Sequence, residues 1–280
     1  MSARGAISGA TKLYGVAGDP VEHSLSPALH GAAFAALGID AVSVGLRADA
    51  DGARSLVDAL RHLGVRGVSV TMPLKGLVAS HCDEVSDTVA RIGSANCLLR
   101  LRDGRVRAES TDGAGLVAAI ACVAGVDVTG QRCAVLGAGG AARAAIDALA
   151  GAGAVDIVVV ARRHEAAEEA ARVAPVARAG SPLDAAEATV IVQATPVGML
   201  GAPAERDREL LDAAALGAGQ VAVELVYHPR VTPWLTRAAS AGAAPVEGIE
   251  VLIHQAAHAL ELWLDAEVPL AALHEAVGAP

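Results

Sequence analysis

A strand that passes through a glycine turn into a helix, at residues 132–150, constrains the fold of this chain more than any other feature. The apolar run Arg132-Cys-Ala-Val-Leu136 meets Gly137-Ala138-Gly139-Gly140-Ala141-Ala142, and an alanine-rich helical pattern follows. Gly137 permits the tight turn, Gly139 lets the backbone approach a pyrophosphate, and Ala142 lets the helix pack closely on the strand. The segment predicts a dinucleotide-binding unit with its phosphate site at the helix N-terminus.

Short β-branched runs alternate with Ala/Leu-rich helical patterns along the chain, which predicts an α/β protein of βα units around parallel sheets. At 280 residues we expect two domains, with a change of character around residues 110–130. The expected strands lie near 13–17, 41–46, 66–71, 132–136, 155–160, 188–193 and 220–225, and the expected helices near 27–37, 50–63, 83–91, 141–150 and 249–264, with a short helix last.

Composition excludes several classes of protein. The net charge is -9 and the arginines are dispersed, which argues against nucleic-acid binding. No apolar run approaches the roughly 18 residues of a membrane span, and the first residues lack the apolar core of a signal peptide. Four cysteines without a C-x-x-C pair indicate neither a zinc site nor a disulfide framework. We therefore expect a cytoplasmic enzyme of small-molecule chemistry, with no metal.

Lysine is scarce in this chain: Lys12 and Lys75 are the only lysines among the 22 lysine and arginine residues. An ammonium can give up its proton, whereas a guanidinium effectively cannot. Lys75 closes the segment Val68-Ser-Val-Thr-Met-Pro-Leu-Lys75 and is a candidate proton-transfer group, with a surface charge at a strand end as the alternative. Lys12 is expected to be a solvated charge.

The strand expected near 155–160 is followed by Arg162 and Arg163, where an NAD-specific site would place an acid for the ribose 2′-hydroxyl. Guanidinium groups there suit a 2′-phosphate instead. NADP is therefore favoured over NAD. One of the two arginines is expected to be merely solvated at a helix start.

Two serines precede an expected helix near the N-terminus. Ser26 before Pro27 is typical of an N-cap followed by the first helical residue, in a helix that ends at Gly38. Ser24 adds a second hydroxyl beside the same helix N-terminus. Together they favour a site for a small carboxylate.

These segments together resemble the shikimate dehydrogenase family. The similar motifs follow the family's order across residues 14 to 263: the Gly18 to His30 loop, Val70-Thr71-Met72-Pro73-Leu74-Lys75, Ile92-Gly93-Ser94-Ala95-Asn96, Ser110-Thr111-Asp112-Gly113, the glycine loop, Ala194-Thr195-Pro196-Val197-Gly198-Met199, Tyr227 with Pro229 and Thr232, and Gly248 with Gln255.

The resemblance implies NADP-linked, reversible reduction of 3-dehydroshikimate to shikimate, a step of chorismate and aromatic amino-acid biosynthesis. It implies a substrate domain at 1–112 completed by 247–280, and a Rossmann-type, doubly wound NADP domain at 113–246. It also implies a monomer or homodimer.

The resemblance further assigns roles to residues. Lys75 would be the acid/base, paired with Asp112, and Ser24 and Ser26 would hold the substrate carboxylate. The rest of the substrate site would be Thr71, Asn96, Tyr227 and Gln255. The cofactor site would be Gly137, Ala138, Gly139, Gly140, Ala141, Arg162, Arg163, Thr195, Leu225 and Gly248. The chemistry agrees, because hydride arriving at a ketone carbon leaves an alkoxide-like oxygen that a nearby ammonium stabilises and protonates.

Some positions depart from the family pattern. Ser69 and Ser110 stand where asparagine is usual, Glu224 replaces the frequent aspartate, and Ala161-Arg162-Arg163 replaces N-R-T. The other departures are Gly31 and Cys97. Because serine replaces asparagine at positions expected near the substrate ring, quinate or an amino analogue of shikimate remains open as the substrate. A catalytically idle NADP-binding sensor is the alternative from another class, and the serine pair and Gln255 disfavour a folate dehydrogenase.

Overall fold

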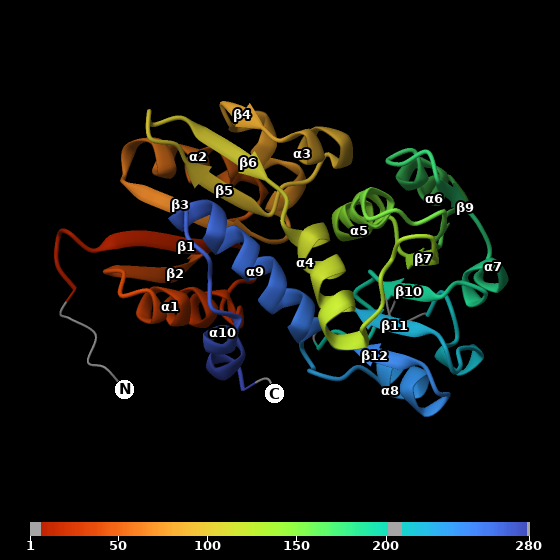
Figure 1. Ribbon diagram of the computed structural model, residues 1–280. Helices are drawn as coiled ribbons and strands as arrows, with labels where there is room; N and C mark the ends of the chain where they lie inside the picture. The colour runs from red at the N-terminus through yellow and green to blue at the C-terminus, as the bar shows by residue number, and fades with distance from the viewer. Residues whose placement is uncertain (1–6, 201–208, 279–280) are drawn as a thin grey trace. The chain divides into compact units, whose positions relative to one another are not determined.

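The computed structural model describes residues 7–200 and 209–278. The chain divides into two compact units, Met1–Thr111 with Ala256–Pro280, and Asp112–Gln255. Each unit is built on its own six-stranded sheet (Figure 1). The two-unit, mixed α/β architecture confirms the fold class expected from the alternating sequence pattern.

The sheet of the first unit has the strand order β2-β1-β3-β5-β6-β4. Its strands are β1 (Lys12–Gly18), β2 (Ala41–Arg47), β3 (Val65–Val70), β4 (Glu84–Val85), β5 (Cys97–Arg100) and β6 (Val106–Glu109). β1, β2 and β3 are parallel as predicted, but β5 is antiparallel to both β3 and β6. This sheet is therefore mixed, because Asp103-Gly104, with Gly104 at φ +90, closes a short hairpin between β5 and β6 that needs no crossover helix.

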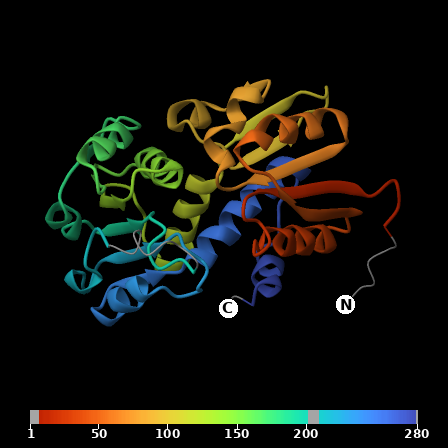
Figure 2. The same cartoon turned by 180° about the vertical axis from the view of Figure 1, so that it is seen from behind.

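Helices pack on both faces of this sheet. They are α1 (Ser26–Ala36), α2 (Ala53–His62), α3 (Asp87–Ile92), α10 (Leu270–Ala276) and the later turns of α9 (Gly248–Leu264). On one face α2 contributes Val57 and Leu60 to an apolar core. On the other, Trp263 lies so close over Gly67 that a Cβ there would come within 2.5 Å of the indole. Figures 1 and 2 show α1 and α10 side by side on that unit.

The helix expected at 83–91 is shorter in the structure. Asp83 accepts the Val106 N–H at 2.8 Å, and Glu84–Val85 pairs with β6 as strand β4. Helix α3 begins only after Ser86, whose hydroxyl accepts the Val89 N–H at 3.3 Å as an N-cap. Sheet pairing therefore overrides helix propensity in the first residues of this segment.

The second unit carries a parallel sheet with the order β12-β11-β10-β7-β8-β9. Its strands are β7 (Arg132–Leu136), β8 (Asp156–Val160), β9 (Ala177–Ala179), β10 (Val190–Gln193), β11 (Val221–Glu224) and β12 (Ala244–Val246). The strand order reverses between β7 and β10, which is the doubly wound arrangement that binds ligands at the carboxyl ends of its strands. The four predicted strands of this unit are confirmed as β7, β8, β10 and β11, whereas β9 and β12 were not predicted.

Both faces of this sheet are covered, as the apolar strand sequences require. The side chains of Cys133 and Val135 enter one core, with α4 (Asp112–Ala119), α5 (Gly140–Gly151) and α6 (His164–Ala171). The alternate residues Ala134 and Leu136 enter the other core, with α7 (Pro182–Ala186) and α8 (Pro233–Ser240). No helix in the described part of the chain is long and apolar enough to cross a membrane.

Candidate active site

In the first unit, the loop that carries the two serines lies against Thr71. A Cβ on Gly18 would come within 2.6 Å of the Met72 carbonyl oxygen, so the approach requires glycine at this position. The Asp19 N–H donates to the same oxygen at 2.9 Å, and the Thr71 N–H donates to Ala17 O at 2.9 Å. The carboxyl ends of β1 and β3 are thereby joined beside the serine loop.

Ser24 and Ser26 lie at the N-terminus of α1, but their roles differ from the prediction. The helix begins at Ser26 itself, with Leu25 at the N-cap position and no capping side chain there. The Ser24 hydroxyl accepts the Ser26 N–H at 3.3 Å and donates to the Ser26 hydroxyl at 3.2 Å. The Ser24 hydroxyl thereby satisfies the N–H of the first helical residue. The two hydroxyls are adjacent, as a carboxylate site would need.

Lys75 lies in a short 3-10 turn, Leu74–Gly76, which begins three residues after Thr71. The Leu74 N–H donates to Thr71 O at 3.0 Å, and the Ala95 N–H donates to Lys75 O at 2.8 Å. Asn96, next to Ala95, accepts the Val70 N–H on its carbonyl at 2.7 Å. Backbone bonds therefore bring Thr71, Lys75 and Asn96 to one edge of the first sheet.

Asn96 also holds the end of the first unit. Its side-chain oxygen accepts the Thr111 N–H at 2.7 Å, and its amide donates to the Thr111 hydroxyl at 3.0 Å. Asp112 follows in the chain and is the first residue of α4, in the second unit. A Cβ on Gly113 would come within 2.6 Å of Ala144 O, so the start of α4 packs directly on α5. Asp112 is thus covalently linked to a residue that Asn96 holds.

Gln255 is placed by the same helix. A Cβ on Gly115 would come within 2.5 Å of the Gln255 backbone nitrogen, so α4 and α9 touch at this glycine. The Gln255 side-chain amide donates to Leu252 O at 3.1 Å. Gln255 is therefore located within the second unit at the contact between α4 and α9.

The glycine loop in the second unit has the conformation that its sequence predicts. Gly137 has φ +128 and donates its N–H to Val160 O at 2.8 Å, which joins the ends of β7 and β8. Gly139 is the N-cap residue of α5, no side chain caps the helix, and a Cβ there would meet no described atom within 4 Å. The space beside Gly139, with the free N–H groups of Gly140 and Ala141 at the helix start, fits a phosphate group.

The remaining cofactor candidates lie at the carboxyl edge of the same sheet. The Ala194 N–H donates to Leu136 O at 2.9 Å, and the Leu225 N–H donates to Gln193 O at 3.1 Å. These bonds align Thr195 and Leu225 with the glycine loop, and Tyr227 follows Leu225. A Cβ on Gly248 would come within 2.6 Å of the Val226 carbonyl carbon, which explains the glycine at the start of α9. Arg162 and Arg163 follow β8 and are both exposed.

Two buried polar residues on this edge had no predicted role. Gln193 and Glu224 end the neighbouring strands β10 and β11, and both are 0% exposed. Burial raises the pKa of Glu224 to about 7, although hydrogen bonds from the Val226 N–H, the Thr232 hydroxyl and the Leu225 N–H act in the opposite direction. A polar residue that closes an apolar strand is the sequence signal that would have found them.

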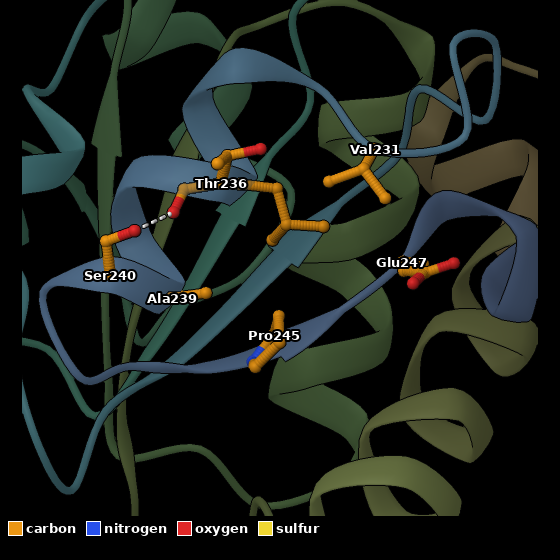
Figure 3. Close-up of a pocket in the computed structure, with 7 residues that line it drawn as sticks. Val231, Thr236, Ala239, Ser240, Pro245 and Glu247 are labelled. Carbon is orange, nitrogen blue, oxygen red and sulfur yellow. Dashed lines mark hydrogen bonds between the residues drawn. The ribbon is translucent and has the colours of Figure 1, made fainter.

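A hollow of about 430 Å³ lies beside α8 and β12 (Figure 3). It is lined by Val231, Leu235, Thr236, Ala239, Ser240, Pro245 and Glu247. None of these residues was predicted to bind substrate or cofactor, but Glu247 directly precedes the predicted cofactor residue Gly248.

Known proteins resemble the chain over nearly its whole length. Residues 16–98 match the model of the shikimate dehydrogenase substrate binding domain, and residues 248–277 match the shikimate 5'-dehydrogenase C-terminal domain. The NADP(+) shikimate dehydrogenase of Methanothermobacter thermautotrophicus is 37% identical, over 97% of both chains. This chain belongs to the shikimate dehydrogenase family. The enzyme of the same name from Caulobacter vibrioides is 41% identical, over 90% of this chain and 89% of its own.

Solved structures of the family agree with the fold. A shikimate dehydrogenase in complex with NADP+ is 31% identical with a TM-score of 0.88, covering 97% of this chain and 96% of its own. The Thermus thermophilus enzyme in complex with NADP(H) and shikimate is 32% identical with a TM-score of 0.86, over 96% and 99%. A quinate dehydrogenase from Corynebacterium glutamicum, in complex with NAD, is 26% identical with a TM-score of 0.85, over 95% and 98%.

Proposed function

We propose that this chain is an NADP-dependent shikimate dehydrogenase, which reversibly reduces the ketone of 3-dehydroshikimate to the hydroxyl of shikimate. The observation that supports the proposal is that backbone hydrogen bonds hold Thr71, Lys75 and Asn96 at one edge of the first sheet, where Asp19 joins the loop that carries the adjacent hydroxyls of Ser24 and Ser26. Relatives named for this activity are 35–41% identical over nearly the full chain, which supports the same assignment.

The proposed roles follow from the chemistry of each group. The serine hydroxyls and the N-terminus of α1 bind the substrate carboxylate. Thr71, Asn96, Tyr227 and Gln255 hydrogen-bond the ring hydroxyls and surround the substrate. The Lys75 ammonium stabilises negative charge on the ketone oxygen during reduction and donates its proton there; in the reverse direction it accepts that proton. Asp112 is proposed as the acid partner that orients Lys75.

NADPH supplies the hydride when it is bound. The N–H groups of residues 139–141 at the start of α5 would hold its pyrophosphate, with Ala138 in the turn that leads to them. Arg162, with Arg163 beside it, would bind the 2′-phosphate through charge-assisted hydrogen bonds. Thr195, Leu225 and Gly248 would line the nicotinamide side of the same edge.

Purified protein incubated with NADP+ and shikimate tests the proposal. We expect the absorbance of reduced nicotinamide to rise with shikimate, more strongly with NADP+ than with NAD+. Quinate in place of shikimate is the matched arm, because a quinate dehydrogenase shares this fold. If only quinate is turned over, quinate and not shikimate is the substrate. Nucleotide binding without turnover of either compound would indicate a sensor.

A further inference from the structure

Two neighbouring strands of the second unit end in the same hydrogen-bonding arrangement. Gln193 closes β10, and its side-chain oxygen accepts the Thr195 N–H at 3.1 Å and the Thr195 hydroxyl at 2.7 Å. Glu224 closes β11 in register with Gln193, and it accepts the Val226 N–H at 3.0 Å and the Thr232 hydroxyl at 2.8 Å. Each long polar side chain therefore folds over the loop that follows its own strand and holds a threonine.

The first loop (residues 194–199, after β10) and the second loop (residues 225–232, after β11) also contact each other. Gly198 has φ +77, and a Cβ there would come within 3.3 Å of the Thr232 Cβ. The Leu200 N–H donates to His228 O at 3.0 Å. Thr232 in turn accepts the Leu235 N–H at 3.2 Å as the N-cap of α8. Thr232, whose hydroxyl Glu224 holds, is thus one of the points at which the two loops meet.

The outer ends of this network touch the other predicted cofactor segments. A Cβ on Gly137 would come within 3.4 Å of the Thr195 Cγ2, so the first loop contacts the glycine loop. A Cβ on Gly248 would come within 2.6 Å of the Val226 carbonyl carbon, so the second loop contacts the start of α9. One connected set of contacts therefore runs between the glycine loop, Thr195, Thr232, Val226 and Gly248.

Stability alone does not account for these polar side chains in the core. Gln193, Glu224 and Thr232 are all 0% exposed. The Gln193 Nε2 is buried and has no hydrogen-bond partner among the described residues. A buried donor without an acceptor costs free energy, and apolar side chains of similar size would pack there without that cost. Polar groups kept at such positions indicate a requirement for geometry in the loops that they hold.

We propose that Glu224 and Gln193 are positioning residues that act through Thr232 and Thr195 to hold loops 194–199 and 225–232 as one nucleotide-binding surface. The proposal rests on the proposed function, because Thr195 and Leu225 are its cofactor contacts. Neither Gln193 nor Glu224 needs to touch the nucleotide. Their effect is to keep both loops in the conformation that binds it.

The test compares Thr232→Val, which keeps the shape and removes the hydroxyl, with Thr232→Ser, which keeps the hydroxyl. NADPH dissociation constants are measured by fluorescence titration without substrate, and amide hydrogen exchange is followed in both loops. We expect Thr232→Val to raise the NADPH dissociation constant about tenfold, the equivalent of one charge-assisted hydrogen bond, and to speed exchange in both 194–199 and 225–232. Thr232→Ser should stay within about twofold of wild type.

Three outcomes would each overturn the proposal. Thr232→Val could bind NADPH with wild-type affinity, Thr232→Val and Thr232→Ser could lose equal affinity, or amide exchange could become faster in loop 225–232 alone. Gln193→Leu is the second variant, since it removes the bonds to Thr195 and also the unpartnered amide. This variant should keep or raise the midpoint of thermal unfolding while weakening NADPH binding about tenfold. Unchanged NADPH affinity would contradict the proposal. Wild-type protein that binds NADPH but ignores shikimate would refute only the proposed function, whereas wild-type protein that binds no nucleotide would refute both.

Discussion

The imidazole of His30 links helix α1 to strand β3 through Ser69. The His30 Nε2 lies 3.3 Å from the Ser69 Oγ, and the Nδ1 lies 2.8 Å from the Ser43 Oγ on β2. The ring packs edge-on against Trp263 at a centroid distance of 5.0 Å. His30 therefore joins the helix that follows the serine loop to the strand that leads to Thr71, and burial lowers its pKa to about 3.

Acid should destabilise the protein through His30. The folded state keeps this imidazole neutral down to about pH 3, whereas the unfolded chain takes up a proton near the ordinary histidine pKa of 6.5. Its contribution is fully present above 6.5 and is lost as the pH falls, by about 2 kcal/mol at pH 5. Urea unfolding at pH 5 and 7.5 should show this loss. His30→Phe should reduce the difference, and a variant of the exposed His62, His62→Gln, should retain it.

Glu224 should destabilise the folded protein as the pH rises, opposite to the effect of His30. Its pKa is raised from 4.5 to about 7 in the folded state by burial, so the unfolded chain ionises first as the pH rises. Stability is therefore lost between these values, by on the order of 3 kcal/mol in total. Glu224→Gln should flatten the change in unfolding free energy between pH 5 and pH 8. The exposed Glu267, changed to Gln, is the control; if both variants behave alike, Glu224 does not titrate as we state.

Lys75 should be required for proton transfer and not only for its charge. Lys75→Arg keeps the positive charge but cannot release a proton, so kcat should fall by about 10²–10⁴, nearly as far as in Lys75→Ala. The NADPH dissociation constant should change little in either variant. Lys12→Arg is the matched control, because Lys12 is exposed at the start of β1. Steady-state kinetics decide the matter, and normal turnover in Lys75→Arg would leave only an electrostatic role.

Arg162 should select NADPH over NADH. Removing its guanidinium deletes charge-assisted bonds to a 2′-phosphate that NADH lacks, so Arg162→Ala should weaken NADPH about 10- to 100-fold and NADH little. Arg163→Ala is the neighbouring comparison, for which we expect a smaller loss. Dissociation constants for both nucleotides at one ionic strength provide the measurement. Equal weakening of NADPH and NADH by Arg162→Ala would remove Arg162 from the 2′-phosphate site.

The elements that the sequence predicted best are those whose signal is local. Strands β7, β8, β10 and β11 are buried on both faces, so continuous apolar runs mark them. The turn at Gly137 needs a glycine for its backbone angle, and its place between strand and helix is visible in the chain. The hairpin of β5 and β6 was missed because its strands are short, and the segment at 83–91 was predicted as helix because its pairing with β6 is not local.

The sequence by itself determined the α/β class, the nucleotide loop, the Lys75 segment and membership of the family, because each depends on residue types at short spacing. Only the tertiary structure decided which distant segments meet. It placed Thr71 beside the Gly18 loop and put Leu25, not Ser26, at the N-cap position of α1. It also joined Glu224 to Thr232 and the loop at Gly198. Such contacts depend on close packing between segments far apart in the chain, which local spacing does not encode.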